Sequence, residues 1–389
     1  MSIKEIFCQD KAISILQRAL AADKMPHAYI FAGPEGVGKF KTAREWAKLL
    51  LCKNPVIIEK TELPVPGHGP RATGDGVFAD SCSRCRSCQL FEADSHPDFN
   101  MVYKELREFT KDGKGKTTPV DLPIDVIREF LIDKVSAKPT LSQRKVFIVS
   151  QAERLNVSSQ NALLKVLEEP PKYCCIILLC TRPEKLLPTT KSRCQTIRFG
   201  AVDEERIIDK LKQDGIDEKK AQFFARLAQG SLGRASQWAG LELADVNLYQ
   251  TKKELINSLS TCEYADTLDL AQWLLGESKK IAATWTDLDK TTSRTDISRR
   301  AQKTLVQIII SALHDAMKLN VAPTEKIINF DQKEQIKNLA QRFDSEQTAE
   351  KIAAAYKILR WIDSSVNEKL IFEQLLLNFA TSDKIVISQ

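Results

Sequence analysis

The most constraining feature of this 389-residue sequence is a glycine-bearing loop that follows the apolar run Tyr29–Ala32 and precedes a helical pattern. The loop fits the phosphate-binding motif G-x-x-x-x-G-K, in which backbone N–H groups surround phosphate oxygens and the following helix N-terminus favours an anion. The candidate nucleotide-binding residues of the loop are Gly33, Gly36, Gly38 and Lys39. A strand, a loop and a helix in this order predict an α/β domain with a parallel sheet and the loop at the carboxyl end of a strand.

The metal-binding positions that accompany such a loop in nucleotide hydrolases are not satisfied. Phe40 stands where a Ser or Thr hydroxyl would bind Mg²⁺, and Thr42 is no substitute because residues two apart on a helix point to different faces. Ser150 and Gln151 follow an apolar strand where hydrolases carry an acidic pair, and Glu153 comes late. These two departures predict a chain that does not hydrolyse ATP by itself, and they leave open whether the loop binds a nucleotide.

A second feature is a cysteine cluster with the spacing C-x2-C-x2-C, formed by Cys82, Cys85 and Cys88. Two-residue spacing lets thiolates converge on one ion, and sulfur ligands at this spacing favour a structural Zn²⁺. Such a site needs a fourth ligand, for which Cys52 is the first candidate and His68 or His96 are alternatives. Three reduced surface thiols or an iron–sulfur cluster also remain open.

Composition places the chain among cytoplasmic proteins. Ten cysteines in a chain of this length do not indicate a secreted disulfide scaffold, and the charged amphipathic N-terminus is not typical of a signal peptide. The longest apolar run, Tyr173–Cys180, is far shorter than the roughly 20 residues that span a membrane. The net charge of +6 permits contact with nucleic acid or an acidic partner without arguing for it.

The remaining pattern divides the chain into an α/β part and an all-α part. Strands are expected near 99–103, 144–150 and 173–180, and helices over 124–135 and 157–169, whereas 53–80 and 109–118 are expected to be irregular. After Phe199 the periodicity is helical, most clearly at 302–319, 349–366 and 367–380. These last helices predict a bundle core or a subunit interface, which the pattern does not separate.

Four segments carry a resemblance to a known family: "HAYIFAGPEGVGK", "RKVFIVSQAERLNVSSQNALLKVLEEPP", "TTKSRCQTIRF" and "NEKLIFEQLLLNF". The sequence resembles the AAA+ clamp-loader subunits of bacterial DNA polymerase III, well over 1–240 and weakly beyond. The resemblance implies an AAA+ P-loop domain at 1–199 with a zinc-binding insertion at about 52–88. It further implies a small helical lid at 200–244 and a helical collar at 245–389, which joins five subunits in a ring.

The resemblance also implies roles for individual residues. Lys39 and Gly38 match the phosphate-binding loop, and Thr181 matches the first sensor residue of the family. Arg193 in "SRC" matches the arginine finger, which reaches into the ATP site of a neighbouring subunit; the alternative is a surface salt bridge. Arg234 lies near the second sensor position, one residue out of register with the ATPase pattern. The zinc module of the family is matched by Cys52, Cys82, Cys85 and Cys88.

Within this family the degenerate ATP motifs favour the delta-prime type over the ATP-hydrolysing gamma/tau type. The expected function is that of a stator that does not hydrolyse ATP and that offers Arg193 to its neighbour while the sliding clamp is loaded on primed DNA. Expected partners are the other subunits of a hetero-pentameric ring, the clamp and DNA, with no membrane. Two alternatives remain: a gamma/tau-like ATPase in which Glu153 or another carboxylate replaces the lost pair, and a zinc-binding adaptor outside replication.

Overall fold

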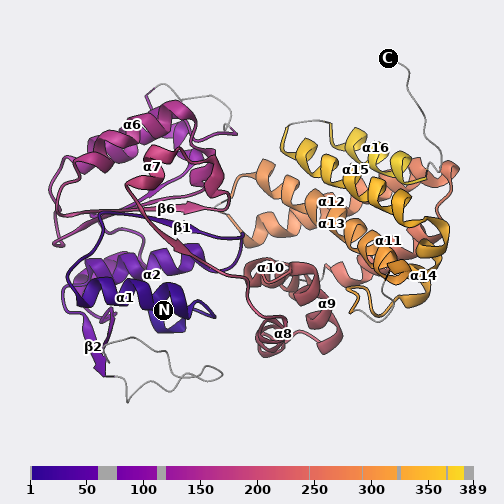
Figure 1. Cartoon of the computed structure of the whole chain (residues 1–389), viewed down its shortest axis with the longest axis horizontal. Coiled ribbons are helices and arrows are strands. Elements are labelled where there is room, and N and C mark those ends of the chain that lie inside the picture. The colour runs from indigo at the N-terminus through magenta and orange to yellow at the C-terminus, as the bar shows by residue number, and fades with distance from the viewer. Residues whose placement is uncertain are drawn as a thin grey trace. The chain divides into compact units, whose positions relative to one another are not determined.

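The computed structural model of the chain describes residues 2–59, 77–111, 120–244, 246–290, 292–321, 326–364 and 367–380. It forms two compact units, Met1–Val202 and Asp203–Gln389, each of which is described by itself (Figure 1). The boundary lies close to the predicted end of the first domain at 199. The division of the second unit into a lid and a collar at 244/245 stays a prediction.

The first unit is built on a five-stranded parallel sheet with the strand order β4–β5–β6–β1–β7. Its strands are β1 (Ala28–Ala32), β4 (Phe99–Val102), β5 (Lys145–Val149), β6 (Cys174–Cys180) and β7 (Gln195–Arg198). The strands predicted near 99–103, 144–150 and 173–180 are confirmed. Since β1 lies between β6 and β7, the chain enters the phosphate-binding motif from inside the sheet.

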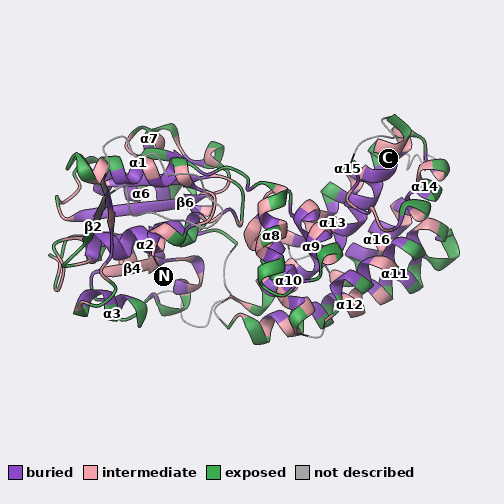
Figure 2. Ribbon diagram, turned by 90° about the horizontal axis from the view of Figure 1, so that it is seen from below, coloured by how far each residue is buried: buried purple, intermediate pink, exposed green. Residues whose placement is uncertain are grey.

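Helices cover both faces of this sheet (Figure 1). Successive residues of a strand point to opposite faces. Tyr29 and Phe31 therefore pack with α1 (Asp10–Ala21) and α2 (Lys39–Leu51), whereas Ile30 packs with α4 (Ile124–Ile127) and α6 (Val157–Glu168). The central strands are buried along their whole length (Figure 2). Burial on both faces is the reason why these strands are unbroken apolar runs in the sequence.

Two expectations about the first unit need correction. The helix predicted over 124–135 is interrupted, because α4 continues as a π-turn, η4 (Arg128–Ile132), before α5 (Asp133–Val135). The stretch 53–80 is not irregular throughout: β2 (Val56–Glu59) and β3 (Val77–Asp80) pair as an antiparallel ribbon. Residues 60–76 between them, and most of the predicted loop at 109–118, lie outside the described residues.

The second unit is helical, and the predicted fold class of an α/β region followed by an all-α region is confirmed. Its helices are α8 (Glu204–Gln213), α9 (Glu218–Ala228), α10 (Leu232–Leu243), α11 (Leu248–Thr261), α12 (Thr267–Leu288), α13 (Arg294–Val321), α14 (Lys333–Arg342), α15 (Ser345–Asp363) and α16 (Glu368–Ala380). Helix α13 packs against α11, α12, α14 and α15. Within the described ranges, no helix is both long and apolar enough to cross a membrane.

A buried polar network fixes the segment between α13 and α14. The Asp315 carboxylate is fully buried and accepts hydrogen bonds from the backbone N–H of Asn329 at 2.7 Å and from its side-chain amide at 2.8 Å. The Asp331 carboxylate pairs with the buried ammonium of Lys252 and accepts a 2.7 Å hydrogen bond from the Tyr249 hydroxyl. These contacts hold the segment against α11 and α13. Breaking them would leave a buried charge without its partner, which lowers the free energy of unfolding by several kcal/mol.

A buried lysine on α15 makes the stability of this unit depend on pH. Lys351 is 8% exposed, donates to the Asn378 carbonyl oxygen at 3.0 Å and lies 4.5 Å from the Phe343 ring centroid. Burial, with Arg342 nearby, lowers its pKa to about 8. Because the unfolded-state pKa is about 10.4, the unfolded chain binds more protons between these values, and the free energy of unfolding rises with pH in that window.

We expect this rise to be on the order of 1–2 kcal/mol between pH 8 and pH 10. Denaturant unfolding of the full chain at several pH values measures it, with Lys351→Met as the control that removes the titrating group. The unfolding free energy of the wild type minus that of Lys351→Met should rise as the pH rises. A difference that stays constant over this range would contradict the assignment.

Candidate nucleotide and metal sites

Backbone geometry explains the glycines of the loop between β1 and α2. A Cβ atom at Gly33 would lie 2.4 Å from the carbonyl oxygen of Phe199, which no side chain tolerates. Gly36 and Gly38 have φ values of 73° and 103°, in the region that favours glycine. The N–H of Gly33 donates to the Cys180 carbonyl oxygen at 3.2 Å, so that the loop is anchored to the end of β6.

The lysine of the motif is engaged by the loop itself. Lys39 Nζ donates to the carbonyl oxygens of Gly33 at 2.7 Å and Pro34 at 2.5 Å, and the residue is only 8% exposed. Burial lowers the pKa of its ammonium group, and the charges of Glu153 and Glu35 partly oppose that shift. The ammonium group is therefore hydrogen-bonded to carbonyl oxygens of its own loop.

The side chains at the metal-binding positions have the properties expected from the sequence. Phe40 is 47% exposed and offers no ligand atom. The Thr42 hydroxyl is buried and donates to the Gly38 carbonyl oxygen at 2.9 Å. After β5, Ser150 continues the sheet through its N–H to Val102, and Gln151 turns the chain with a φ of 51°. None of these residues supplies a carboxylate for Mg²⁺.

Glu153 comes later in the sequence than the acidic pair of a nucleotide hydrolase, but the fold brings its carboxylate back to the end of β6. The left-handed turn at Gln151 leads into η5 (Ala152–Arg154), which returns the Glu153 carboxylate towards the end of β6. There it accepts hydrogen bonds from the Thr181 hydroxyl at 2.5 Å and the Thr181 N–H at 3.1 Å. The predicted sensor position therefore meets a carboxylate. A single residue with positive φ is a weak sequence signal, since Gln is not typical of such turns.

Gln9 is a second residue that the sequence analysis missed. It precedes α1 and is 4% exposed, and its side-chain amide donates to the carbonyl oxygens of Val37 and Gly200, both at 3.0 Å. It therefore joins the phosphate-binding loop to the end of the β7 segment. A single glutamine beside the charged residues Asp10 and Lys11 gives no pattern from which this contact between distant parts of the sequence could be predicted.

The two predicted arginines lie in different units. Arg193 follows α7 (Pro188–Ser192), is about one-third exposed, and pairs through Nη2 with Glu168 Oε1 at 2.7 Å. Its Nη1 donates to the Thr189 carbonyl oxygen at 3.0 Å. Arg234 belongs to α10 in the second unit, where its guanidinium carbon lies 5.4 Å from the Trp238 ring centroid. The nucleotide role of Arg234 stays a prediction.

The four predicted cysteine ligands come together. The sulfur atoms of Cys52, Cys82, Cys85 and Cys88 all lie within 4.8 Å of one another. Cys52 caps the C-terminus of α2, and its Sγ lies 3.5 Å from that of Cys82 and 4.0 Å from that of Cys85. These separations are far too long for disulfide bonds of about 2.05 Å. The cluster is a set of soft ligands that could hold one metal ion.

Backbone N–H groups stabilise negative charge on part of this cluster. The N–H of Cys82 donates to Cys52 Sγ and the N–H of Cys85 donates to Cys82 Sγ, both at 3.4 Å. Burial raises the pKa of the Cys85 thiol, but backbone N–H donors from Cys88 and Lys53, together with side-chain hydrogen bonds to Cys82 and Cys88, outweigh burial and lower this pKa to about 6. A lowered thiol pKa favours the thiolate, which is the form that binds a metal.

One of the histidine alternatives for the fourth ligand, His96, is engaged elsewhere. His96 is buried, and its Nδ1 accepts a hydrogen bond from the Asp98 N–H at 3.1 Å. Its Nε2 lies 2.8 Å from the Ser87 hydroxyl, which in turn donates to the Leu51 carbonyl oxygen at 2.6 Å. Both ring nitrogens are therefore used within the protein core, next to the cluster but not in it. His68 lies outside the described residues.

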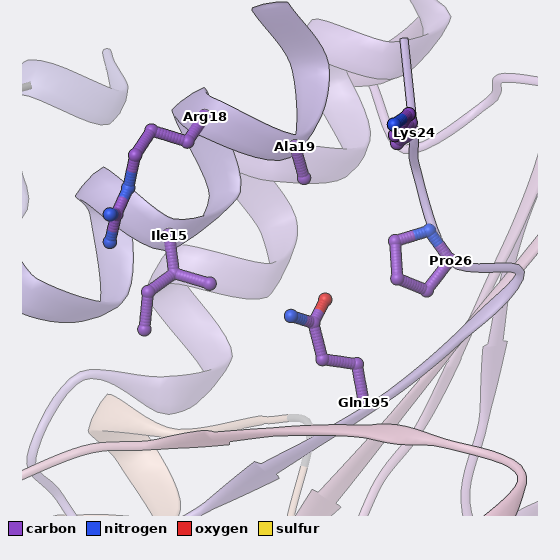
Figure 3. A pocket seen from close by; sticks show the side chains of 6 residues that line it. All are labelled: Ile15, Arg18, Ala19, Lys24, Pro26 and Gln195. Carbon is purple, nitrogen blue, oxygen red and sulfur yellow. The ribbon is translucent and has the colours of Figure 1, made fainter. Parts of the chain in front are cut away.

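A groove of about 490 Å³ lies on the first unit beside α1 and the edge strand β7 (Figure 3). Gln195 points from the strand towards Ile15 and Ala19 of α1 (Figure 3). The residues that line the groove are Ile15, Arg18, Ala19, Lys24, Pro26 and Gln195. None of them is a predicted site residue, so the groove is separate from the phosphate-binding loop and from the cysteine cluster.

Comparison with known proteins agrees with this architecture. The family model described as "DNA polymerase III, delta subunit" matches residues 8–62 and 73–203, and the one described as "DNA polymerase III, delta subunit, C terminal" matches 296–381. DNA polymerase III subunit delta′ of Bacillus subtilis (strain 168) is 23% identical over 374 residues, which cover 95% of each chain.

Two further relatives represent both types of subunit. Subunit delta′ of Pseudomonas aeruginosa is 34% identical over 168 residues, 43% of this chain and 41% of that relative. Subunit gamma of Buchnera aphidicola subsp. Schizaphis graminum is 28% identical over 402 residues, 98% of this chain and 96% of that relative. The matches thus include delta′ and gamma subunits alike. The chain belongs to the family of DNA polymerase III clamp-loader subunits.

Proposed function

We propose that this chain is a delta-prime-type stator of a clamp loader, which does not hydrolyse ATP itself. The observation that carries the proposal is the lack of Mg²⁺ ligands at the two positions where a nucleotide hydrolase needs them. Phe40 offers no ligand atom, and Ser150 and Gln151 supply no carboxylate. Phosphoryl transfer depends almost entirely on positioning and on charge stabilisation by such groups. A site without Mg²⁺ ligands fits a subunit that maintains the geometry of the ring and leaves ATP hydrolysis to its neighbours.

In the same proposal, Arg193 is the catalytic contribution of the chain to a neighbouring subunit. A planar guanidinium stabilises the charge that develops on a transferred phosphoryl group. Arg193 is one-third exposed at the end of a short helix, so it is accessible to a partner. The partners are then the other clamp-loader subunits of a ring joined through the collar at 245–389, the sliding clamp, and primed DNA held through its backbone phosphates.

We further propose that the cysteine cluster binds a structural Zn²⁺. Zinc–sulfur bonds of about 2.3 Å in a tetrahedron place the sulfur atoms about 3.8 Å apart. Three of the Sγ separations are 3.5–4.0 Å, close to that value, and all lie within 4.8 Å. An iron–sulfur cluster contains several iron atoms and would hold its cysteines further apart. The ion would tie the end of α2 to the turn before α3 (Arg86–Glu92).

The test of the stator role is nucleotide turnover by the isolated full-length chain, with Mg²⁺ and with primed DNA. We expect no turnover above background, whether or not a nucleotide binds, because the metal-binding positions are missing. Lys39→Ala is the matched control and should leave this background unchanged. Clear turnover that Lys39→Ala abolishes would overturn the proposal and identify the chain as a motor subunit.

One observation favours the gamma/tau-like alternative. The Glu153 carboxylate lies at the end of β6, hydrogen-bonded to Thr181 and near enough to Lys39 to influence its pKa. If this carboxylate replaced the missing acidic pair, the turnover of the isolated chain would be lost in Glu153→Gln as well as in Lys39→Ala. The same assay therefore separates the two functions.

A further inference from the structure

The proposed arginine finger is held by a carboxylate of its own chain. Arg193 Nη2 lies 2.7 Å from Glu168 Oε1, and Arg193 Nη1 donates to the Thr189 carbonyl oxygen at 3.0 Å. Both side chains remain accessible, with about one-third of Arg193 and one-half of Glu168 exposed. The guanidinium can therefore exchange this partner for another anion without disturbing the core.

The position of Glu168 favours a cation beside it. It is the last residue of α6, where the helix dipole places a partial negative charge. Helix C-termini favour cations and disfavour carboxylates. Arg193 therefore adds to the compensation that Lys165, in the last turn of α6, gives to the negative charge at this helix end. The ion pair between Arg193 and Glu168 therefore re-forms when the guanidinium has left its other partner.

The frame around the pair is rigid, so the two groups meet in a defined geometry. Gln160 of α6 is 2% exposed and joins this helix to the segment before α7. Its side-chain amide donates to the Lys185 carbonyl oxygen at 3.3 Å, and its side-chain oxygen accepts the Leu187 N–H at 2.8 Å. Helices α6 and α7 lie on the same side of the sheet (Figure 1). Only the side chain of Arg193 has to move for the exchange.

We propose that Glu168 is a positioning residue that holds Arg193 in a resting ion pair until the anionic phosphate of a nucleotide in the neighbouring subunit replaces Glu168 as its partner. This inference rests on the proposed finger role of Arg193. Exchange of one oxyanion for another conserves charge and needs no further reactant. An exposed ion pair is weak, whereas a guanidinium can bind a phosphate through two parallel hydrogen bonds. A correctly placed phosphate therefore readily replaces Glu168 as the partner of Arg193, and the resting ion pair forms again when the phosphate leaves.

The experiment compares the DNA-stimulated ATPase of reconstituted complexes that carry wild-type chain, Glu168→Gln, Arg193→Ala, or both substitutions. Glu168→Gln keeps the shape of the side chain and removes its charge. We expect it to raise the Arg193-dependent rate by about 1.5- to 5-fold, the range spanned by exposed ion pairs. The same substitution should have no effect when Arg193 is already alanine. Glu169→Gln is the matched control, because it makes the same charge change one residue away and should leave the rate unchanged.

A second measurement follows the pair in the isolated chain, where no ATPase is needed. The NMR signal of the Arg193 side-chain Nε–H should show slower guanidinium rotation in the wild-type chain and in Glu169→Gln than in Glu168→Gln. If Arg193→Ala leaves the ATPase unchanged, the finger role fails. If Arg193→Ala lowers the rate but Glu168→Gln changes neither rate nor rotation, only the positioning role of Glu168 is overturned. An increase in rate that persists in the double variant, or that Glu169→Gln reproduces, would also overturn it.

Discussion

Removal of the metal from the cysteine cluster is expected to destabilise the first unit by several kcal/mol. Structural zinc sites contribute apparent binding free energies of about 10–16 kcal/mol in small zinc-binding peptides. Whole domains have unfolding free energies of about 5–15 kcal/mol. Even a fraction of the zinc-binding free energy would therefore decide whether the first unit stays folded. Once the cation is gone, the four sulfur atoms within 4.8 Å of one another take up protons and lose the bonds that tie the end of α2 to the turn before α3.

The measurement is metal content together with thermal unfolding. Purified wild-type chain should carry close to one zinc per chain, and a chelator should lower its unfolding temperature. Cys85→Ser should reproduce both losses, because three ligands no longer close a structural site. Cys8→Ser is the control, since this cysteine lies outside the cluster and its loss should leave the zinc in place. Less than about half a zinc per chain in the wild type would defeat the zinc assignment.

The elements that sequence patterns predicted correctly are those whose burial is one-sided or complete. β5 and β6 are apolar at nearly every position because both of their faces are covered, and that property is visible in a short window of sequence. The long helices α13 and α15 show helical periodicity because the residues that they bury recur at helical spacing. In contrast, the π-turn at η4 depends on one extra residue per turn, which leaves the apolar positions almost unchanged.

The candidate sites were predictable where a motif is local and not where two distant segments meet. Cys52 could be proposed as the fourth ligand because the helix after the loop ends there. The return of Glu153 to Thr181 depends on the conformation of a single turn residue. The pairing of Arg193 with Glu168 depends on how α6 and α7 pack, which no spacing in the sequence encodes. Side-chain partners across helices therefore had to come from the structure.

Arg193→Ala in the reconstituted complex is expected to cause the largest loss of activity. An arginine finger contributes about 10³- to 10⁵-fold to phosphoryl transfer at the site that it completes. ATP hydrolysis at the neighbouring site should therefore be almost abolished. The DNA-stimulated ATPase rate of the complex should drop by at least the contribution of that site. Arg193→Lys should not restore it, because an ammonium group lacks the planar fork that contacts two oxygens at once.

Assembly of the complex should survive this substitution, which separates the finger role from a structural one. Arg193 is about one-third exposed, and its pair with Glu168 is a surface contact of a kind that adds at most about 1 kcal/mol. Size-exclusion chromatography should show an intact complex while the ATPase is lost, and Arg198→Ala, an exposed arginine on β7, should change neither. If the ATPase is unchanged, Arg193 has no finger role. If activity and assembly are lost together, the arginine is part of a subunit interface instead.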